Sequence, residues 1–165
     1  MNQILPYSLW IGHAGDGVAF RQLVDAGIGT IVQLAYEETP IQPPRDMTLI
    51  RIPLVDGEGN EPHLLQLAID VVHSLLFMKV PTLVCCQAGI SRSPAIAGAA
   101  LSRHLGCEFD QALKTISEHR RAWIAPMLLA EVRMALSAPS CHATPLHRPG
   151  VASDRSDESR DQRGL

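Results

Sequence analysis

The sequence predicts an α/β domain in which a central, mostly parallel mixed sheet carries helices on both faces. Short runs of Ile, Val and Leu alternate with longer amphipathic segments along most of the chain. The segment Thr82 to Cys86 has the apolar character of a strand buried on both faces of a parallel sheet. A chain of 165 residues suits one domain with one core that needs no disulfide or metal for stability.

The first half of the chain predicts a strand, a helix and two more strands. Asp16 is a candidate for the start of the helix and Gly27 for the residue that ends it. A proline-containing loop from Glu37 to Asp46 separates the second and third strands. The expected bounds are a strand at Tyr7–Ile11, a helix from Asp16 to Ala26, and strands at Ile28–Ala35 and Thr48–Leu54.

The second half predicts one buried strand among four helices. Apolar residues at helical spacing follow Pro62, and an alanine-rich segment that ends at Gly106 follows the strand. The expected elements are a helix from Asn60 to Lys79, the strand Thr82–Cys86, and helices at Ser93–His104, Asp110–Arg121 and Pro126–Leu136. We expect residues 1–136 to form the domain. Ser137 to Leu165 lacks aromatic residues and predicts a disordered tail.

Composition excludes several classes of function. A net charge of −3 offers no basic surface for nucleic acid, and no apolar stretch is long enough to cross a membrane. Four cysteines without a CxxC pair indicate free thiols in a reducing compartment, so we expect a cytoplasmic protein. The seven histidines show no metal-ligand spacing, and no metal site is expected.

The segment "CQAGISRS" carries the chemistry. Cys86 and Arg92 are separated by five residues, where a buried strand ends and a helix begins, with Gly89 inside the turn. Such a turn presents backbone N–H groups at a helix N-terminus, which suits a tetrahedral anion. The same field favours a thiolate, and the planar guanidinium of Arg92 suits phosphoryl oxygens. Cys85 is one residue too far from Arg92 and fits a small buried side chain instead.

These residues resemble the dual-specificity branch of the cysteine-dependent protein tyrosine phosphatases, whose signature is His-Cys-x5-Arg-Ser/Thr. The phosphate loop matches Cys86 to Ser93, and the resemblance extends through "SLWIGHAGD", "IPLVDGEGN" and "RRAWIAP". It implies a single-domain phosphatase without a cofactor that hydrolyses phosphotyrosine through a phosphocysteine. Whether phosphoserine and phosphothreonine are also substrates stays open. The implied partner is a phosphorylated protein, bound by a monomer.

The resemblance also assigns roles. Cys86 would attack phosphorus, Asp56 would act as general acid and then general base, and Ser93 would help the sulfur to leave. Ser91 would mainly shape the loop. The equatorial oxygens would be held by the side chain of Arg92 and the backbone of Gln87, Ala88, Gly89, Ile90, Ser91 and Arg92.

One residue departs from the signature, because Cys85 stands where the family has histidine. We expect the missing histidine to leave less Cys86 ionised near neutral pH and to lower activity. Cys85 could instead take part in redox control with Cys86, Cys107 or Cys141, provided that the fold brings the pair close. The segment "EHRRAW", Glu118 to Trp123, is expected to be an exposed helix end with Trp123 packed inward, and a docking role is the alternative.

Two other functions stay open. The departure at Cys85 would fit a catalytically weak protein that binds phosphorylated partners. The second open function is a phosphatase or reductase of small molecules, such as phosphoinositides, inositol phosphates, RNA 5′ ends or arsenate. The loop segment "QAGIS" argues against highly phosphorylated ligands because it contains no lysine or arginine.

Overall fold

The structure is a computed structural model, and it describes residues 1–137. Its elements are β1 (Asn2–Gln3), β2 (Leu9–His13), α1 (Ala14–Gly17), α2 (Phe20–Asp25), β3 (Thr30–Ala35), β4 (Thr48–Leu54), α3 (Pro62–Phe77), β5 (Thr82–Cys86), α4 (Arg92–Leu105), α5 (Phe109–His119) and α6 (Pro126–Ser137). The tail expected after residue 136 lies, apart from Ser137, outside the described residues.

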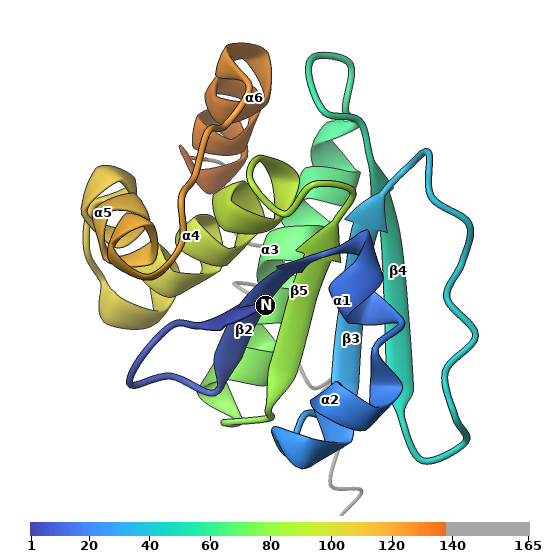
Figure 1. Ribbon diagram of the computed structural model, residues 1–165. Coiled ribbons are helices and arrows are strands. Elements are labelled where there is room, and N and C mark those ends of the chain that lie inside the picture. Colours follow the sequence, from blue (N-terminus) through green and yellow to red (C-terminus); the bar gives the residue numbers. More distant parts are fainter. Residues whose placement is uncertain (138–165) are drawn as a thin grey trace, which may run out of the picture.

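The strands form one sheet in the order β1-β2-β5-β3-β4 (Figure 1). The short β1 is antiparallel to β2, and the other three strand pairs are parallel. The predicted fold class, a mostly parallel mixed sheet with helices on both faces, is therefore confirmed. The carboxyl ends of the four parallel strands meet at one edge of the sheet, which is where ligands bind in open α/β folds.

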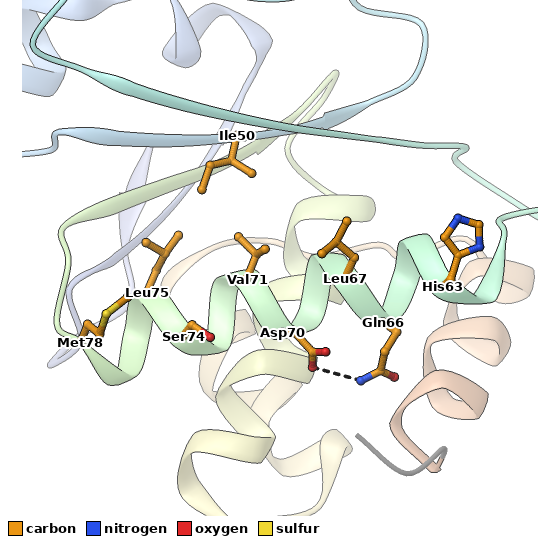
Figure 2. Close-up of a pocket in the computed structure, with 9 residues that line it drawn as sticks. All are labelled: Ile50, His63, Gln66, Leu67, Asp70, Val71, Ser74, Leu75 and Met78. Carbon is orange, nitrogen blue, oxygen red and sulfur yellow. Dashed lines mark hydrogen bonds between the residues drawn. The ribbon is translucent and has the colours of Figure 1, made fainter. Parts of the chain in front are cut away.

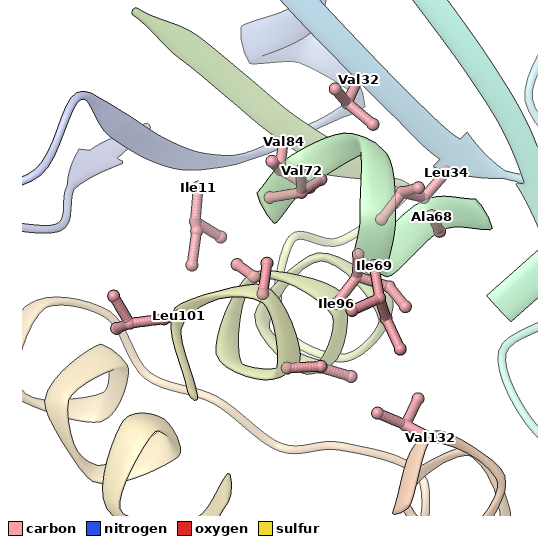
Figure 3. Packing of buried hydrophobic residues seen from close by; sticks show 14 of the residues in the cluster. Ile11, Val32, Leu34, Ala68, Ile69, Val72, Val84, Ile96, Leu101 and Val132 are labelled. Atoms are coloured by element: carbon pink, nitrogen blue, oxygen red, sulfur yellow. The ribbon is translucent and has the colours of Figure 1, made fainter. Parts of the chain in front are cut away.

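Helices cover the two faces of the sheet unequally (Figure 1). Helices α3 and α4 pack on one face, and α5 and α6 pack on these two helices. The larger hydrophobic core on this side takes side chains from β2, β3, β5, α3, α4 and α6 (Figure 3). The opposite face carries α2 and a smaller cluster that includes Leu23, Ile31 and Cys85. Because side chains alternate along β5, Cys85 and Cys86 belong to different clusters on opposite faces.

Most predicted elements are present, two of them with the predicted bounds, the strands Thr48–Leu54 and Thr82–Cys86. The single helix predicted from Asp16 to Ala26 is wrong, since two short helices, α1 and α2, stand there. Asp16 lies inside α1, and its Oδ2 accepts a hydrogen bond of 2.9 Å from the His13 amide. Gly17 ends α1, and glycine is a poor residue for continuing a helix.

A groove of about 670 Å³ lies between α3 and the outer strand β4 (Figure 2). Ile50 reaches toward it from β4, and Leu67, Val71 and Leu75 reach toward it from α3. It is lined mainly by apolar side chains and contains none of the residues of the Cys-x5-Arg segment. The predicted chemistry therefore belongs elsewhere.

Candidate active site

Cys86 is the last residue of β5, and Arg92 is the first residue of α4, so residues 87–91 form the turn between them. This is the strand-to-helix turn that the spacing predicts. The Cys86 side chain is buried, and its Sγ lies 3.2 Å from the hydroxyl oxygen of Ser93. Both groups lie at the N-terminal end of α4, where the helix dipole favours negative charge.

Three carbonyls of this turn are held by neighbouring segments. The Gln87 carbonyl accepts a hydrogen bond from the Ala14 amide at 3.1 Å, and the Ile90 carbonyl accepts one from the Trp123 amide at 2.7 Å. The Gly89 carbonyl accepts one from Arg120 Nε at 2.6 Å. In a planar trans peptide the N–H points opposite to the carbonyl, so the amides that follow these carbonyls are free to face the inside of the turn. These three bonds engage the carbonyls on the outer side of the turn, which is compatible with an anion-binding loop.

Gly89 is required at its position in the turn. Its φ is +69°, a conformation that costs free energy for residues with a side chain. A Cβ added there would lie 2.5 Å from the backbone oxygen of Gly12 and 2.5 Å from Nη2 of Arg120. The turn can approach β2 this closely only because residue 89 has no side chain.

Arg92 is 1% exposed and pairs with Glu37, a residue that no sequence motif identifies. Its Nη1 and Nη2 donate to the two carboxylate oxygens of Glu37, each at 2.5 Å, and Nη1 also donates to the Leu54 carbonyl at 3.0 Å. Within residues 1–137 the buried Nε has no hydrogen-bond partner. Glu37 thus fixes one edge of the guanidinium, and the Nε edge keeps a donor for a ligand oxygen.

The pair keeps its charges over a wide pH range. The hydrogen bonds from Arg92 hold the pKa of Glu37 below its usual value, against an opposing effect of burial. Burial lowers the pKa of Arg92, but its bond to Glu37 and the nearby negative charges outweigh this, so its pKa is raised. As pH falls, Glu37 therefore stays ionised below the range in which an ordinary glutamate takes up a proton.

Asp56 lies in the loop after β4 and reaches the Cys-x5-Arg turn. The Ser91 hydroxyl donates to Asp56 Oδ1 at 2.5 Å and accepts a hydrogen bond from the Ala125 amide at 3.1 Å. The structure thus brings Asp56 beside the turn, as predicted, and gives Ser91 a contact with the carboxylate in addition to a place in the loop. Glu58, from the same loop, has no such contact among those described.

The loop that carries Asp56 is fastened at its far end. Asn60 accepts a hydrogen bond from the Val55 amide at 2.8 Å and donates to the Gly57 carbonyl at 3.1 Å. Glu131, on α6, accepts hydrogen bonds from the Gly59 amide at 2.7 Å and from Asn60 Nδ2 at 2.9 Å. These bonds set the path of the loop and hence the position of Asp56.

Cys85 is not placed to form a disulfide with Cys86. It lies on the face of the sheet opposite to Cys86, and a Cβ at Gly17 would be 3.1 Å from its Sγ. Cys107 follows α4, whose 14 residues separate it from Cys86 by roughly 20 Å, far beyond disulfide distance. Pairing of Cys86 with Cys85 or Cys107 is therefore ruled out by the fold, and Cys141 lies outside the described residues.

Cys85 should resist alkylation in the folded protein. Burial, helped by the nearby charges of Cys86, Asp16 and Glu38, raises its pKa to about 12, so the thiol stays neutral at pH 7 to 9 and only a thiolate reacts quickly. We expect peptide mapping after iodoacetamide treatment at pH 8 to show Cys107, which is partly exposed, labelled well before Cys85. Both should be labelled in urea. Equal labelling rates in the folded protein would contradict this burial.

The prediction that Trp123 packs inward is wrong, because its side chain is 72% exposed. The segment after α5 is held to the turn by Arg120 and by the Trp123 amide, so its backbone is fixed while the indole projects. Arg120 was missed as a loop-holding residue because nothing in the spacing shows that α5 ends beside Gly89. Glu37 follows β3 at the same sheet edge as Cys86, so its place could have been inferred from a parallel sheet.

A pocket of about 300 Å³ opens beside the turn. Its polar members are Asp56 and Ser91, which are hydrogen-bonded to each other. The remaining lining residues are Ala88, Ile90, Trp123, Ala125 and Pro126. The pocket thus adjoins both the predicted anion site and the carboxylate.

The family model described as "Tc-R-P: Polymorphic toxin system, DSP-PTPase phosphatase" matches residues 13–106, more than half of the chain. The chain belongs to this family of phosphatases. The match includes Glu37, Asp56 and the whole turn from Cys86 to Ser93. The protein is therefore a cysteine-dependent phosphatase, a hydrolase, as its sequence predicted.

Solved structures of dual-specificity phosphatases are similar to this phosphatase. Human DUSP28 is 24% identical with a TM-score of 0.73, over 82% of this chain and 95% of that chain. A mouse putative dual specificity phosphatase, complexed with zinc tungstate, is 26% identical with a TM-score of 0.72, over 81% and 84% of the two chains. DUSP15 is 25% identical with a TM-score of 0.68, over 84% and 88%.

No curated protein sequence matches the phosphatase. Within residues 1–137 none of its helices combines the length and the apolar character that crossing a membrane requires. The family match ends at residue 106, so Arg120 and Trp123 lie beyond it.

Proposed function

We propose that the phosphatase hydrolyses phosphotyrosine in proteins through a phosphocysteine on Cys86. The observation that carries the proposal is the convergence of three groups on one turn: the Cys86 thiol, the buried Nε edge of Arg92 and the Asp56 carboxylate. The mouse putative dual specificity phosphatase of similar fold is complexed with zinc tungstate, a salt of a tetrahedral oxyanion, and this supports an anion site in the present protein. Phosphoserine and phosphothreonine stay open as further substrates, and the experiment below tests phosphothreonine.

In the first step the Cys86 thiolate attacks phosphorus. The S–P bond forms while the P–O bond to the substrate breaks, and Asp56 gives its proton to the leaving oxygen. Arg92 Nε and the amides of residues 87–92 hold the equatorial oxygens, whose charge grows in the transition state. Glu37 orients the guanidinium for this task through its two bonds of 2.5 Å.

In the second step water attacks the phosphocysteine. Asp56, now a carboxylate, accepts a proton from the water, the P–S bond breaks, and inorganic phosphate is released. The Ser93 hydroxyl, 3.2 Å from Sγ, donates a hydrogen bond to the sulfur as negative charge returns to it. Cys86 is then a thiolate again and Asp56 is protonated.

Steady-state hydrolysis of para-nitrophenyl phosphate and of phosphotyrosine and phosphothreonine peptides tests the proposal. Release of phosphate by the wild-type protein supports it. Binding of the phosphopeptides without turnover would favour the alternative that the departure at Cys85 left open, a protein that binds phosphorylated partners.

Arg92→Lys should lower kcat by about 10²–10³-fold, the usual effect of losing a well-placed donor to the transition state. Lysine keeps the charge but cannot bond Glu37 and a phosphate oxygen along two edges at once. The measurement is kcat for para-nitrophenyl phosphate, with Arg103→Lys as a control, because Arg103 pairs with Asp70 away from the turn. Equal kcat for wild type and Arg92→Lys would contradict the role of the guanidinium.

We further propose one catalytic domain over residues 1–136 that acts as a monomer in the cytoplasm. The single sheet and the site built from one chain support the first two points. The free thiols of Cys85, Cys86 and Cys107, and a nucleophile that must stay reduced, support the compartment. Elution volume on a calibrated column tests the monomer.

A further inference from the structure

The pocket of about 300 Å³ beside the turn has a polar side and an apolar side. Asp56 and Ser91 are hydrogen-bonded on the polar side, while Ile90, Trp123 and Pro126 supply apolar surface. Its volume is at the lower end for ligand sites. No lysine or arginine lines it, which disfavours ligands with several phosphates.

Trp123 is the most unusual member of this pocket. Its indole is 72% exposed, although large aromatic side chains usually bury most of their surface. The backbone that carries it is fixed to the turn, since the Trp123 amide donates to the Ile90 carbonyl at 2.7 Å and the Ala125 amide donates to the Ser91 hydroxyl at 3.1 Å. A projecting aromatic group on a fixed support loses little conformational freedom when a ligand covers it.

The two kinds of phosphoester place different groups against this indole. Asp56, the proposed proton donor to the leaving oxygen, lines this pocket, so a phosphate held in the turn would direct the atoms attached to its ester oxygen toward it. Phosphotyrosine places an aromatic ring there, which can stack on or meet the edge of an indole. Phosphoserine and phosphothreonine have shorter side chains, so they place the peptide backbone closer to the turn. The polar groups of that backbone would lose water against the apolar side of the pocket.

We propose that Trp123 is a specificity-determining residue, which contacts the ring of phosphotyrosine and so favours aryl over alkyl phosphoesters. This inference rests on the proposed function of the turn and adds to it a residue outside the family match. The ring contact exists before and during the reaction, so it acts mainly through KM.

Two peptides that differ only in phosphotyrosine or phosphothreonine at one position test the proposal. Trp123→Leu keeps apolar volume and removes the ring, and Trp123→Phe keeps a ring. We expect Trp123→Leu to lower kcat/KM for the phosphotyrosine peptide about 3- to 10-fold, chiefly through KM, and Trp123→Phe to stay within about 2-fold of wild type. The phosphothreonine peptide should change less than about 2-fold in both.

Met127→Leu is the matched control, since Met127 is also exposed and lies next to Pro126 but does not line the pocket. Its kcat/KM for both peptides should equal that of wild type. Equal losses for the two peptides in Trp123→Leu, or no loss for either, would overturn the role in specificity.

A binding measurement separates this proposal from the proposed function. The chain has two tryptophans, Trp10 and Trp123, so fluorescence of Cys86→Ser can be titrated with each tryptophan-free peptide. The phosphotyrosine peptide should quench it, and adding Trp123→Phe should remove the quenching. If wild type hydrolyses neither peptide, the proposed function fails, and this titration alone decides the inference. Quenching that persists without Trp123, or that is equal for both peptides, overturns it.

Discussion

Cys86→Ser is expected to abolish turnover of every phosphoester while the fold is kept. A serine hydroxyl fills nearly the same space and can keep the hydrogen bond to Ser93, but it is not ionised near neutral pH and attacks phosphorus poorly. Loss of a nucleophile lowers kcat by on the order of 10⁴–10⁶-fold. The measurement is kcat for para-nitrophenyl phosphate, together with binding of inorganic phosphate, which should persist.

Cys85→Ala is the matched control for this variant. Cys85 is the adjacent residue, equally buried, but it packs on the other face of the sheet. We expect it to cost about 1 kcal/mol of stability, as small truncations in a core do, and to leave kcat within about 2-fold of wild type. Loss of activity in Cys85→Ala comparable to that in Cys86→Ser would show that the wrong cysteine has been assigned.

Asp56→Asn is expected to show the second largest loss, about 10²–10⁴-fold in kcat for peptide substrates, the usual range for a general acid. Asparagine can still accept the hydrogen bond from Ser91, so the loop should keep its path while the proton donor is lost. The loss should be smaller for para-nitrophenyl phosphate, because nitrophenolate leaves readily without a proton. The ratio of kcat between the two substrates is the measurement.

Glu58→Gln tests whether the position in the loop matters or only the charge. Glu58 lies two residues from Asp56 in the same loop. We expect its substitution to leave kcat nearly unchanged for both substrates. If Glu58→Gln produced the large loss and Asp56→Asn did not, the assignment of the acid would have to be exchanged.

The sequence predicts the sheet well because buried parallel strands are nearly uniform in character. Thr82–Cys86 is a fully buried run between clear breaks, and Thr48–Leu54, the edge strand, keeps Leu and Ile on both sides of Arg51; the structure has strands with these bounds. The single helix predicted from Asp16 to Ala26 is wrong: α1 ends at Gly17, where an added Cβ would lie 2.8 Å from Ile41 Cδ1 and 3.1 Å from Cys85 Sγ. That packing joins segments far apart in the chain, which local periodicity does not contain.

In the candidate site, too, the sequence predicts the residues that lie close together in the chain and misses those that only the fold brings together. Cys86 and Arg92 lie six positions apart at the two ends of one turn, so their spacing alone predicts that they act together. Glu37 and Arg120 act on the turn from segments 55 and 31 residues away from their partners Arg92 and Gly89, and only the fold brings them there. Trp123 was expected to be buried because large aromatic residues usually are, and its exposure is what draws attention to it.

Covalent catalysis by Cys86 is tested most directly by a search for phosphate on Cys86 itself. Ser93→Ala removes the hydroxyl 3.2 Å from Sγ and should slow the second step, so the intermediate should accumulate. The protein is mixed with a phosphotyrosine peptide, quenched in acid within milliseconds and digested for mass spectrometry. We expect phosphate on the peptide that contains Cys86, in an amount approaching one per protein. Dephosphorylation of the substrate with no phosphate on Cys86 at any time would contradict it.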